Sequence, residues 1–254
     1  MNTTSRTHAT AFRLLLATSV TVLLTACGGG SDSSTGGTIT PPAGFDTSTL
    51  QGRWATASGA TPGYTALVVP DSSGNTATAW VLAQDASRLV KVSATSSQSA
   101  TGKSYDLATP GSTATGISSG SYSANLTASP KSISFVNVLG TSLSFTQSDS
   151  LSGIAAYADA AGTWKASAGA VDVTWTLNDT GTISGSSTSG CSYAGSTTTP
   201  TTVKLYQTSF TETCNGTATA FAGIATLNTE KTRLTVAATT TSDAKAIALF
   251  FVKQ

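Results

Sequence analysis

The chain has 254 residues, of which only 10% are charged, and 13 Lys and Arg stand against 12 Asp and Glu. A nearly neutral chain without a basic stripe has little to release counterions from a phosphate backbone, which excludes nucleic acid as an expected partner. The single histidine is His8, near the N-terminus, so the rest of the chain cannot contain a Ser-His-Asp, Cys-His or HExxH site. We therefore expect no enzymatic activity, no cofactor and no metal.

The first 26 residues have the parts of a secretory signal. Arg6 and Arg13 supply positive charge, and a mostly apolar segment runs from Leu14 to Leu24. This segment is shorter than the roughly 20 apolar residues that span a bilayer. It ends in Leu24-Thr25-Ala26-Cys27, which resembles the lipobox of bacterial lipoproteins. The alternative is an ordinary secretory signal in which Cys27 is incidental.

The lipoprotein resemblance implies cleavage before Cys27 and acylation of that residue, so that the membrane is a direct partner. Two or more acyl chains hold a protein stably, whereas one chain binds only marginally. Glycines follow Cys27, in place of the aspartate that retains many such lipoproteins in the inner membrane. The resemblance therefore implies an outer-membrane anchor, facing either the periplasm or the cell surface. Residues 27–49, rich in Gly, Ser, Thr and Pro, are expected to form a disordered tether.

The remaining residues predict an all-β fold of two consecutive small antiparallel modules, residues 50–150 and 151–254. Apolar and polar residues alternate, most clearly from Tyr122 to Leu126 and from Val171 to Leu177, which argues against a disordered stalk. Turn signals separate roughly seven or eight strands in each half. Barrels and sandwiches both fit this spacing, and a single continuous sandwich is the alternative. A short helical turn is expected at residues 154–160.

A short repeat opens the two halves. Gly52-Arg53-Trp54 and Gly162-Thr163-Trp164 lie 110 residues apart, which favours two related modules. The Gly-x-Trp pattern is similar to the first-strand signature of lipocalins, antiparallel barrels that carry small apolar ligands. This resemblance implies that Trp54 and Trp164 border a ligand, and that a late arginine, here Arg233, packs over Trp164. The alternative is that both tryptophans are core residues at one end of each barrel.

Two cysteines remain if Cys27 is acylated. Cys191 and Cys214 would lie in an oxidising compartment, where a pair of thiols normally forms a disulfide. A metal site or a redox switch is the alternative, but the chain offers no histidine beyond the signal and no CxxC spacing. We predict a structural disulfide.

Three short motifs resemble catalytic ones without their structural context. Gly116–Gly120 spells GxSxG, but a nucleophile elbow needs a strand-to-helix turn and a histidine partner, so we expect a loop. Ser242–Lys245 spells SxxK and is expected to be a turn that enters the last strand. Gly102-Lys103-Ser104 matches the end of a P-loop, but Ser97 stands where the first glycine is required.

These observations predict a non-enzymatic, membrane-anchored lipoprotein with a structural or binding role at the cell envelope. Its partner would be another envelope protein or a small apolar ligand. One alternative is a lipocalin-like carrier. Another is a hydrolase of cell-wall or polysaccharide substrates that uses two carboxylates. The acids are few and stand mostly beside turn residues, which favours solvated turns over catalysis.

Overall fold

The computed structural model describes residues 45–61, 63–107, 114–168 and 170–254. The predicted signal, Cys27 and residues 27–44 of the predicted tether lie outside these ranges. The described residues belong to one compact unit. Within the described ranges, no helix has both the length and the hydropathy needed to cross a membrane.

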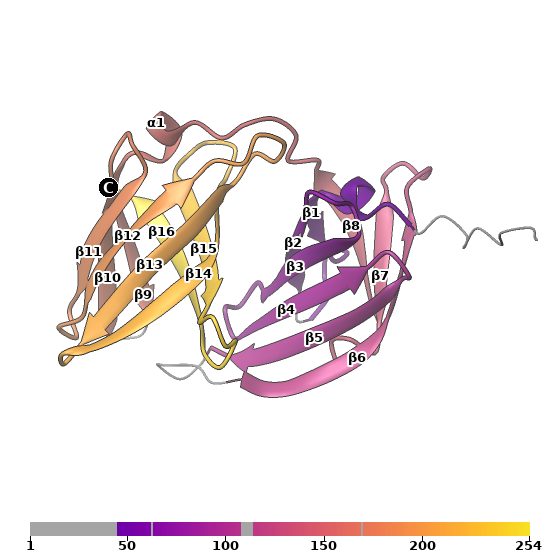
Figure 1. Cartoon of the computed structure of the whole chain (residues 1–254), viewed down its shortest axis with the longest axis horizontal. Coiled ribbons are helices and arrows are strands. Elements are labelled where there is room, and N and C mark those ends of the chain that lie inside the picture. The colour runs from indigo at the N-terminus through magenta and orange to yellow at the C-terminus, as the bar shows by residue number, and fades with distance from the viewer. Residues whose placement is uncertain (1–44, 62, 108–113, 169) are drawn as a thin grey trace, which may run out of the picture. The chain divides into compact units, whose positions relative to one another are not determined.

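The first barrel consists of eight antiparallel strands in chain order, and it closes because β1 pairs with β8 as well as with β2 (Figure 1). A 3₁₀ turn, η1 (Thr47–Leu50), precedes the first strand. The strands are β1 (Gly52–Ala55), β2 (Tyr64–Pro70), β3 (Thr76–Ala83), β4 (Arg88–Thr95), β5 (Ser99–Asp106), β6 (Ala114–Asn125), β7 (Ser132–Val136) and β8 (Leu143–Asp149).

The second barrel repeats this arrangement and closes through the pairing of β9 with β16 (Figure 1). A short helix, α1 (Tyr157–Ala160), precedes it and confirms the predicted helical turn. The strands are β9 (Gly162–Ala168), β10 (Val171–Leu177), β11 (Thr182–Ser187), β12 (Ser192–Thr198), β13 (Tyr206–Cys214), β14 (Thr217–Leu227), β15 (Arg233–Thr239) and β16 (Ala246–Lys253). Two closed barrels confirm the predicted all-β pair of modules and exclude the single sandwich.

The folded part begins before residue 50. The backbone N–H of Phe45 donates to the carbonyl of Ser96, and Phe45 packs against the core of the first barrel. Thr47 is fully buried. The predicted tether, residues 27–49, therefore overlaps the first barrel at residues 45–49.

The Gly-x-Trp repeat is a structural repeat. The indole Nε1 of Trp54 donates to the carbonyl of Leu50 at 3.0 Å, and that of Trp164 donates to the carbonyl of Ala160 at 2.7 Å. Each tryptophan thus caps the helical turn four residues before it, where carbonyl groups lack intrahelical partners. Gly52 and Gly162 have φ values of +152° and +130°, a region that disfavours side chains.

Side chains occupy the interiors of both barrels. Small and branched residues from β2–β5 and aromatic residues from β6–β8 form the core of the first barrel, where Phe135 contacts Tyr122 and Phe145. Aromatic rings dominate the core of the second barrel. There the ring centre of Trp175 lies 4.9 Å from that of Phe210 and 5.0 Å from that of Phe251. Eight-stranded barrels are just wide enough for such filling.

One local prediction was wrong. The GxSxG segment at Gly116–Gly120 is not a loop but part of β6. Gly120 is required there because a Cβ atom would collide with the carbonyl oxygen of Val136 on β7. Ser118 donates its hydroxyl to the carbonyl of Val138, so it is a structural residue. The SxxK segment is the turn between β15 and β16, as predicted.

Candidate functional site

The two barrels are joined by a third apolar cluster. It combines outward-facing residues of β2–β5 with residues of the second barrel and of two connecting segments. Trp80 and Tyr105 are its largest members from the first barrel, and the second barrel contributes Ile224 and Leu205. All four are at most 5% exposed. The cluster thus brings apolar residues of both barrels into one buried contact.

Polar contacts flank this cluster. The Nη2 atom of Arg53 donates to the Thr226 hydroxyl at 2.8 Å and to the Leu227 carbonyl at 3.0 Å. Elsewhere at the interface, the backbone N–H of Ala114 donates to the carbonyl of Ala244 in the β15–β16 turn. The Tyr105 hydroxyl donates to the carbonyl of Asp243 in that turn at 3.0 Å, and burial raises the pKa of Tyr105. The phenol therefore remains a donor.

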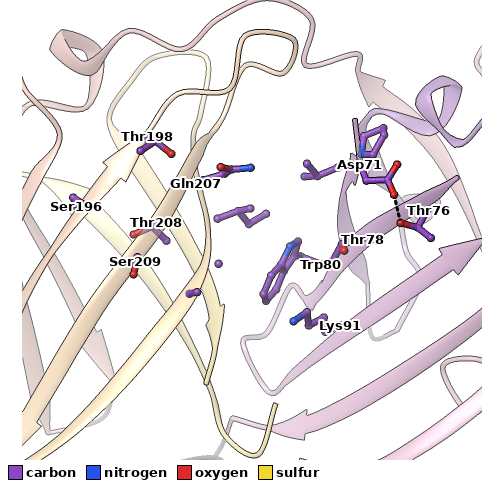
Figure 2. Close-up of a pocket in the computed structure, with 15 residues that line it drawn as sticks. Asp71, Thr76, Thr78, Trp80, Lys91, Ser196, Thr198, Gln207, Thr208 and Ser209 are labelled. Atoms are coloured by element: carbon purple, nitrogen blue, oxygen red, sulfur yellow. Dashed lines mark hydrogen bonds between the residues drawn. The ribbon is translucent and has the colours of Figure 1, made fainter. Parts of the chain in front are cut away.

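An interbarrel groove of about 520 Å³ lies beside the apolar cluster (Figure 2). Hydroxyl, amide and apolar groups dominate its walls. The first barrel contributes Asp71, Thr76, Thr78, Trp80 and Lys91. The second contributes Ser196, Thr198, Gln207, Thr208 and Ser209, with Ile224 as an apolar neighbour. Figure 2 shows the Gln207 amide and the Trp80 indole extending into the groove from opposite walls.

The carboxylate of Asp71, at the rim of this groove, accepts hydrogen bonds from residues of its own turn. Asp71 Oδ1 accepts hydrogen bonds from the backbone and side chain of Ser73, and Oδ2 accepts one from the Thr76 hydroxyl at 2.5 Å (Figure 2). The bonds from Thr76 and Ser73 lower the pKa of Asp71 to about 2. Asp71 therefore shapes the β2–β3 turn and is a poor candidate for an acid or base at neutral pH.

The cation in the groove is also paired. Lys91 Nζ lies 2.9 Å from Asp243 Oδ1 and 5.2 Å from the centre of the Trp80 ring. Burial opposes ionisation of Asp243, but hydrogen bonds from Thr239 and Lys91, with the charges of Lys91 and Lys103, outweigh it and lower its pKa. The charge of Lys91 is thus neutralised by Asp243, whereas Asp71 stays ionised and is held by neutral hydrogen-bond donors.

This ion pair gives a testable pH dependence. A carboxyl whose pKa is lowered by folding stabilises the native state above its unfolded pKa, about 4, and this contribution disappears as the pH falls through the lower folded pKa. We expect Asp243→Asn to lower the free energy of unfolding by about 1 kcal/mol at pH 7, because the pair is partly exposed. Denaturation should show this difference shrinking as the pH falls from about 4 toward about 2. A difference that persists undiminished there would show that the effect is not ionic.

The structure places the predicted tryptophans in the barrel cores. Trp54 and Trp164 are 0% exposed, and they lie on different barrels, so they form no common site. The cation over the Trp164 ring is Lys253, with Nζ 5.3 Å from the ring centre, and not the predicted Arg233. Arg233 is exposed at the start of β15, paired with Val252 of β16, because the strand register directs it outward. Both tryptophans are thus core residues.

The predicted disulfide between Cys191 and Cys214 is present. It joins the residue before β12 to the last residue of β13. Glu212 lies beside it, with a carboxylate oxygen within 4.8 Å of both sulfur atoms. The disulfide occupies the two sulfur atoms that would otherwise be potential thiolate ligands.

Two carboxylates line a smaller pocket of about 150 Å³, but both make structural contacts. Asp159 forms an ion pair with Lys231 at 2.7 Å, and Asp149 Oδ1 accepts the backbone N–H of Leu151 at 2.9 Å. Hydrolysis by two carboxylates needs one acid free to donate a proton and one free to attack or activate water. The contacts of Asp149 and Asp159 do not favour that chemistry.

Sequence reasoning missed the groove, because its residues come from strands far apart in the chain. One available signal was the apolar run Ala79-Trp80-Val81-Leu82-Ala83, which lacks alternation and is therefore typical of a strand buried on both faces.

No family model matches the chain, and neither the curated proteins nor the solved structures contain a match. The candidate site therefore stands on its geometry.

Proposed function

We propose that the protein is a non-enzymatic, lipid-anchored binding protein of the bacterial cell envelope, and that its ligand occupies the interbarrel groove. The observation that carries the proposal is a groove of about 520 Å³ lined by hydroxyl and amide groups from both barrels. This volume lies in the usual range for small-ligand sites, roughly 300–1,000 Å³. The filled barrel interiors favour this groove over a ligand enclosed within a barrel, as a lipocalin-like carrier would require.

The chemistry of the groove favours a neutral, hydroxyl-rich ligand, namely a short segment of an uncharged glycan. Thr78, Gln207 and Ser209 offer donors and acceptors, while Trp80 and Ile224 offer apolar surface against which C–H groups can pack. Lys91 forms an ion pair with Asp243, and Asp71 accepts hydrogen bonds from Ser73 and Thr76, so an ionic ligand would have to displace an existing contact. An uncharged ligand avoids that cost.

The binding test is a calorimetric titration of the full chain carrying Cys27→Ser with neutral trisaccharides of glucose and of N-acetylglucosamine. We expect Gln207→Ala to weaken the association about tenfold, because one hydrogen bond contributes about 1 kcal/mol and buried groups left unpaired add to the loss. Gln254→Ala, an exposed glutamine outside the groove lining, is the matched control. Equal affinities for the two variants would contradict the proposal.

The anchor is tested separately. In a bacterial host that processes lipoproteins, the wild-type protein is expected in the membrane fraction, whereas Cys27→Ser should move it to the soluble fraction. The physical reason is that acyl chains supply the membrane affinity, at about 0.8 kcal/mol per buried CH₂. Cell fractionation with immunodetection measures this. An unchanged distribution would show that Cys27 is not the attachment point, without bearing on the groove.

A further inference from the structure

A second groove at the barrel interface has a different chemical character. This arginine groove, of about 310 Å³, is lined by Arg53, Arg233, Leu67, Leu82, Leu227 and Phe250, together with small polar residues. The first barrel supplies Arg53 on β1 and the leucines of β2 and β3. The second barrel supplies Leu227, Arg233 and Phe250 on β14, β15 and β16.

The charged residues that line this groove are both cations. Its lining includes two guanidinium groups and no Asp or Glu. Arg53 is fixed by the two bonds that its Nη2 atom donates to Thr226 and Leu227, both of which are neutral acceptors. The guanidinium of Arg233 makes no hydrogen bond or ion pair with the described part of the chain. Since a guanidinium carries five N–H donors and is always ionised, the groove has donors available for an anion.

An apolar surface adjoins these charges. Leu67 and Leu82 are buried at 2% and 4% exposure, whereas the ring of Phe250 is 40% exposed. A large exposed aromatic residue is uncommon in this chain, whose outward-facing strand positions are mostly Ser and Thr. The combination of a charged rim with an apolar wall suits a molecule that is anionic at one end and apolar at the other.

We propose that the arginine groove binds a single-chain amphiphile with an anionic head. The head would accept hydrogen bonds from Arg233 and from the free donors of Arg53, and the chain would pack against the exposed ring of Phe250. Bidentate pairing of a guanidinium with a carboxylate or phosphate supplies both energy and orientation. The site is independent of the interbarrel groove, because the two grooves share no lining residue, so failure of either proposal leaves the other intact.

The test uses the full chain carrying Cys27→Ser, titrated calorimetrically below micellar concentrations. The probes are dodecanoate and dodecyl phosphate, with dodecyltrimethylammonium as the cationic control and inorganic phosphate as the head alone. We expect both anionic amphiphiles to bind at least tenfold more tightly than either control. A preference for dodecanoate indicates a fatty acid as the natural source, and a preference for dodecyl phosphate indicates a phosphate-headed lipid.

Two variants locate the site. Arg233→Gln should weaken binding of the preferred amphiphile roughly tenfold or more, as expected for a lost charge-assisted hydrogen bond, and Arg233→Lys should restore part of it. Lys131→Gln removes the same charge from an exposed turn outside the groove and should leave the affinity unchanged. Equal affinity of the anionic and cationic probes, or equal weakening by Arg233→Gln and Lys131→Gln, would overturn the proposal.

Discussion

Replacing Trp164 with alanine is expected to lower the free energy of unfolding of the second barrel by about 3–5 kcal/mol. The side chain is fully buried, and its indole Nε1 satisfies the carbonyl of Ala160 at the end of α1. The substitution therefore creates a cavity and leaves a buried acceptor without its partner. Because a small domain has a net stability of only about 5–15 kcal/mol, the loss is large. Chemical denaturation followed by circular dichroism measures it.

A matched pair of conservative substitutions separates the two causes. Trp164→Phe and Trp175→Phe remove similar volume from the same core, but in the described part of the chain Trp175 Nε1 has no hydrogen-bond partner. Trp164→Phe should cost about 1–3 kcal/mol more than Trp175→Phe, because only the former orphans a carbonyl. Equal costs would show that volume alone matters, and that the indole bond of the repeated motif contributes nothing.

Loss of the disulfide is the second large effect. Cys191 and Cys214 are 23 residues apart, so the bond closes a loop that contains β12 and most of β13. In the chain-entropy account, closing a loop of this size stabilises the fold by about 3 kcal/mol, chiefly by restricting the unfolded chain. The double substitution to serine should lower the unfolding free energy by that amount and should abolish the effect of added reductant. Wild-type protein whose stability is unaffected by complete reduction would contradict this expectation.

The sequence predicted strands best where one face of a strand packs against the barrel core and the other face points outward. Alternation from Val171 to Leu177 marked β10 correctly, since Val173, Trp175 and Leu177 are buried and the residues between them are not. The Gly-x-Trp repeat marked the two barrel openings, because a positive φ before a core tryptophan constrains both residue types. The disulfide was predicted from the cysteine count and the expected oxidising compartment.

Other features could not be read from local pattern. The first barrel closes because β1 pairs with β8, almost a hundred residues later in the chain. Patterns within a short stretch of sequence do not predict which residues of two such distant strands pair. The contact between barrels depends on Arg53 reaching Thr226 and on Lys91 reaching Asp243, two partnerships between residues more than 150 positions apart. In β6, Ser118 and Gly120 mimicked a loop, because the backbone at Val136 and Val138 lies against this face of the strand and leaves room only for small residues.

Ligand binding in the interbarrel groove is tested most directly by the indole N–H signals of the four tryptophans in a ¹H–¹⁵N NMR titration with a neutral trisaccharide. Trp80 is the tryptophan that lines the interbarrel groove, whereas Trp54, Trp164 and Trp175 belong to the barrel cores. We predict that the Trp80 signal shifts in a saturable manner and that the three core signals stay in place. Saturable shifts at Trp54 or Trp164, or no shift at Trp80, would contradict binding in the groove.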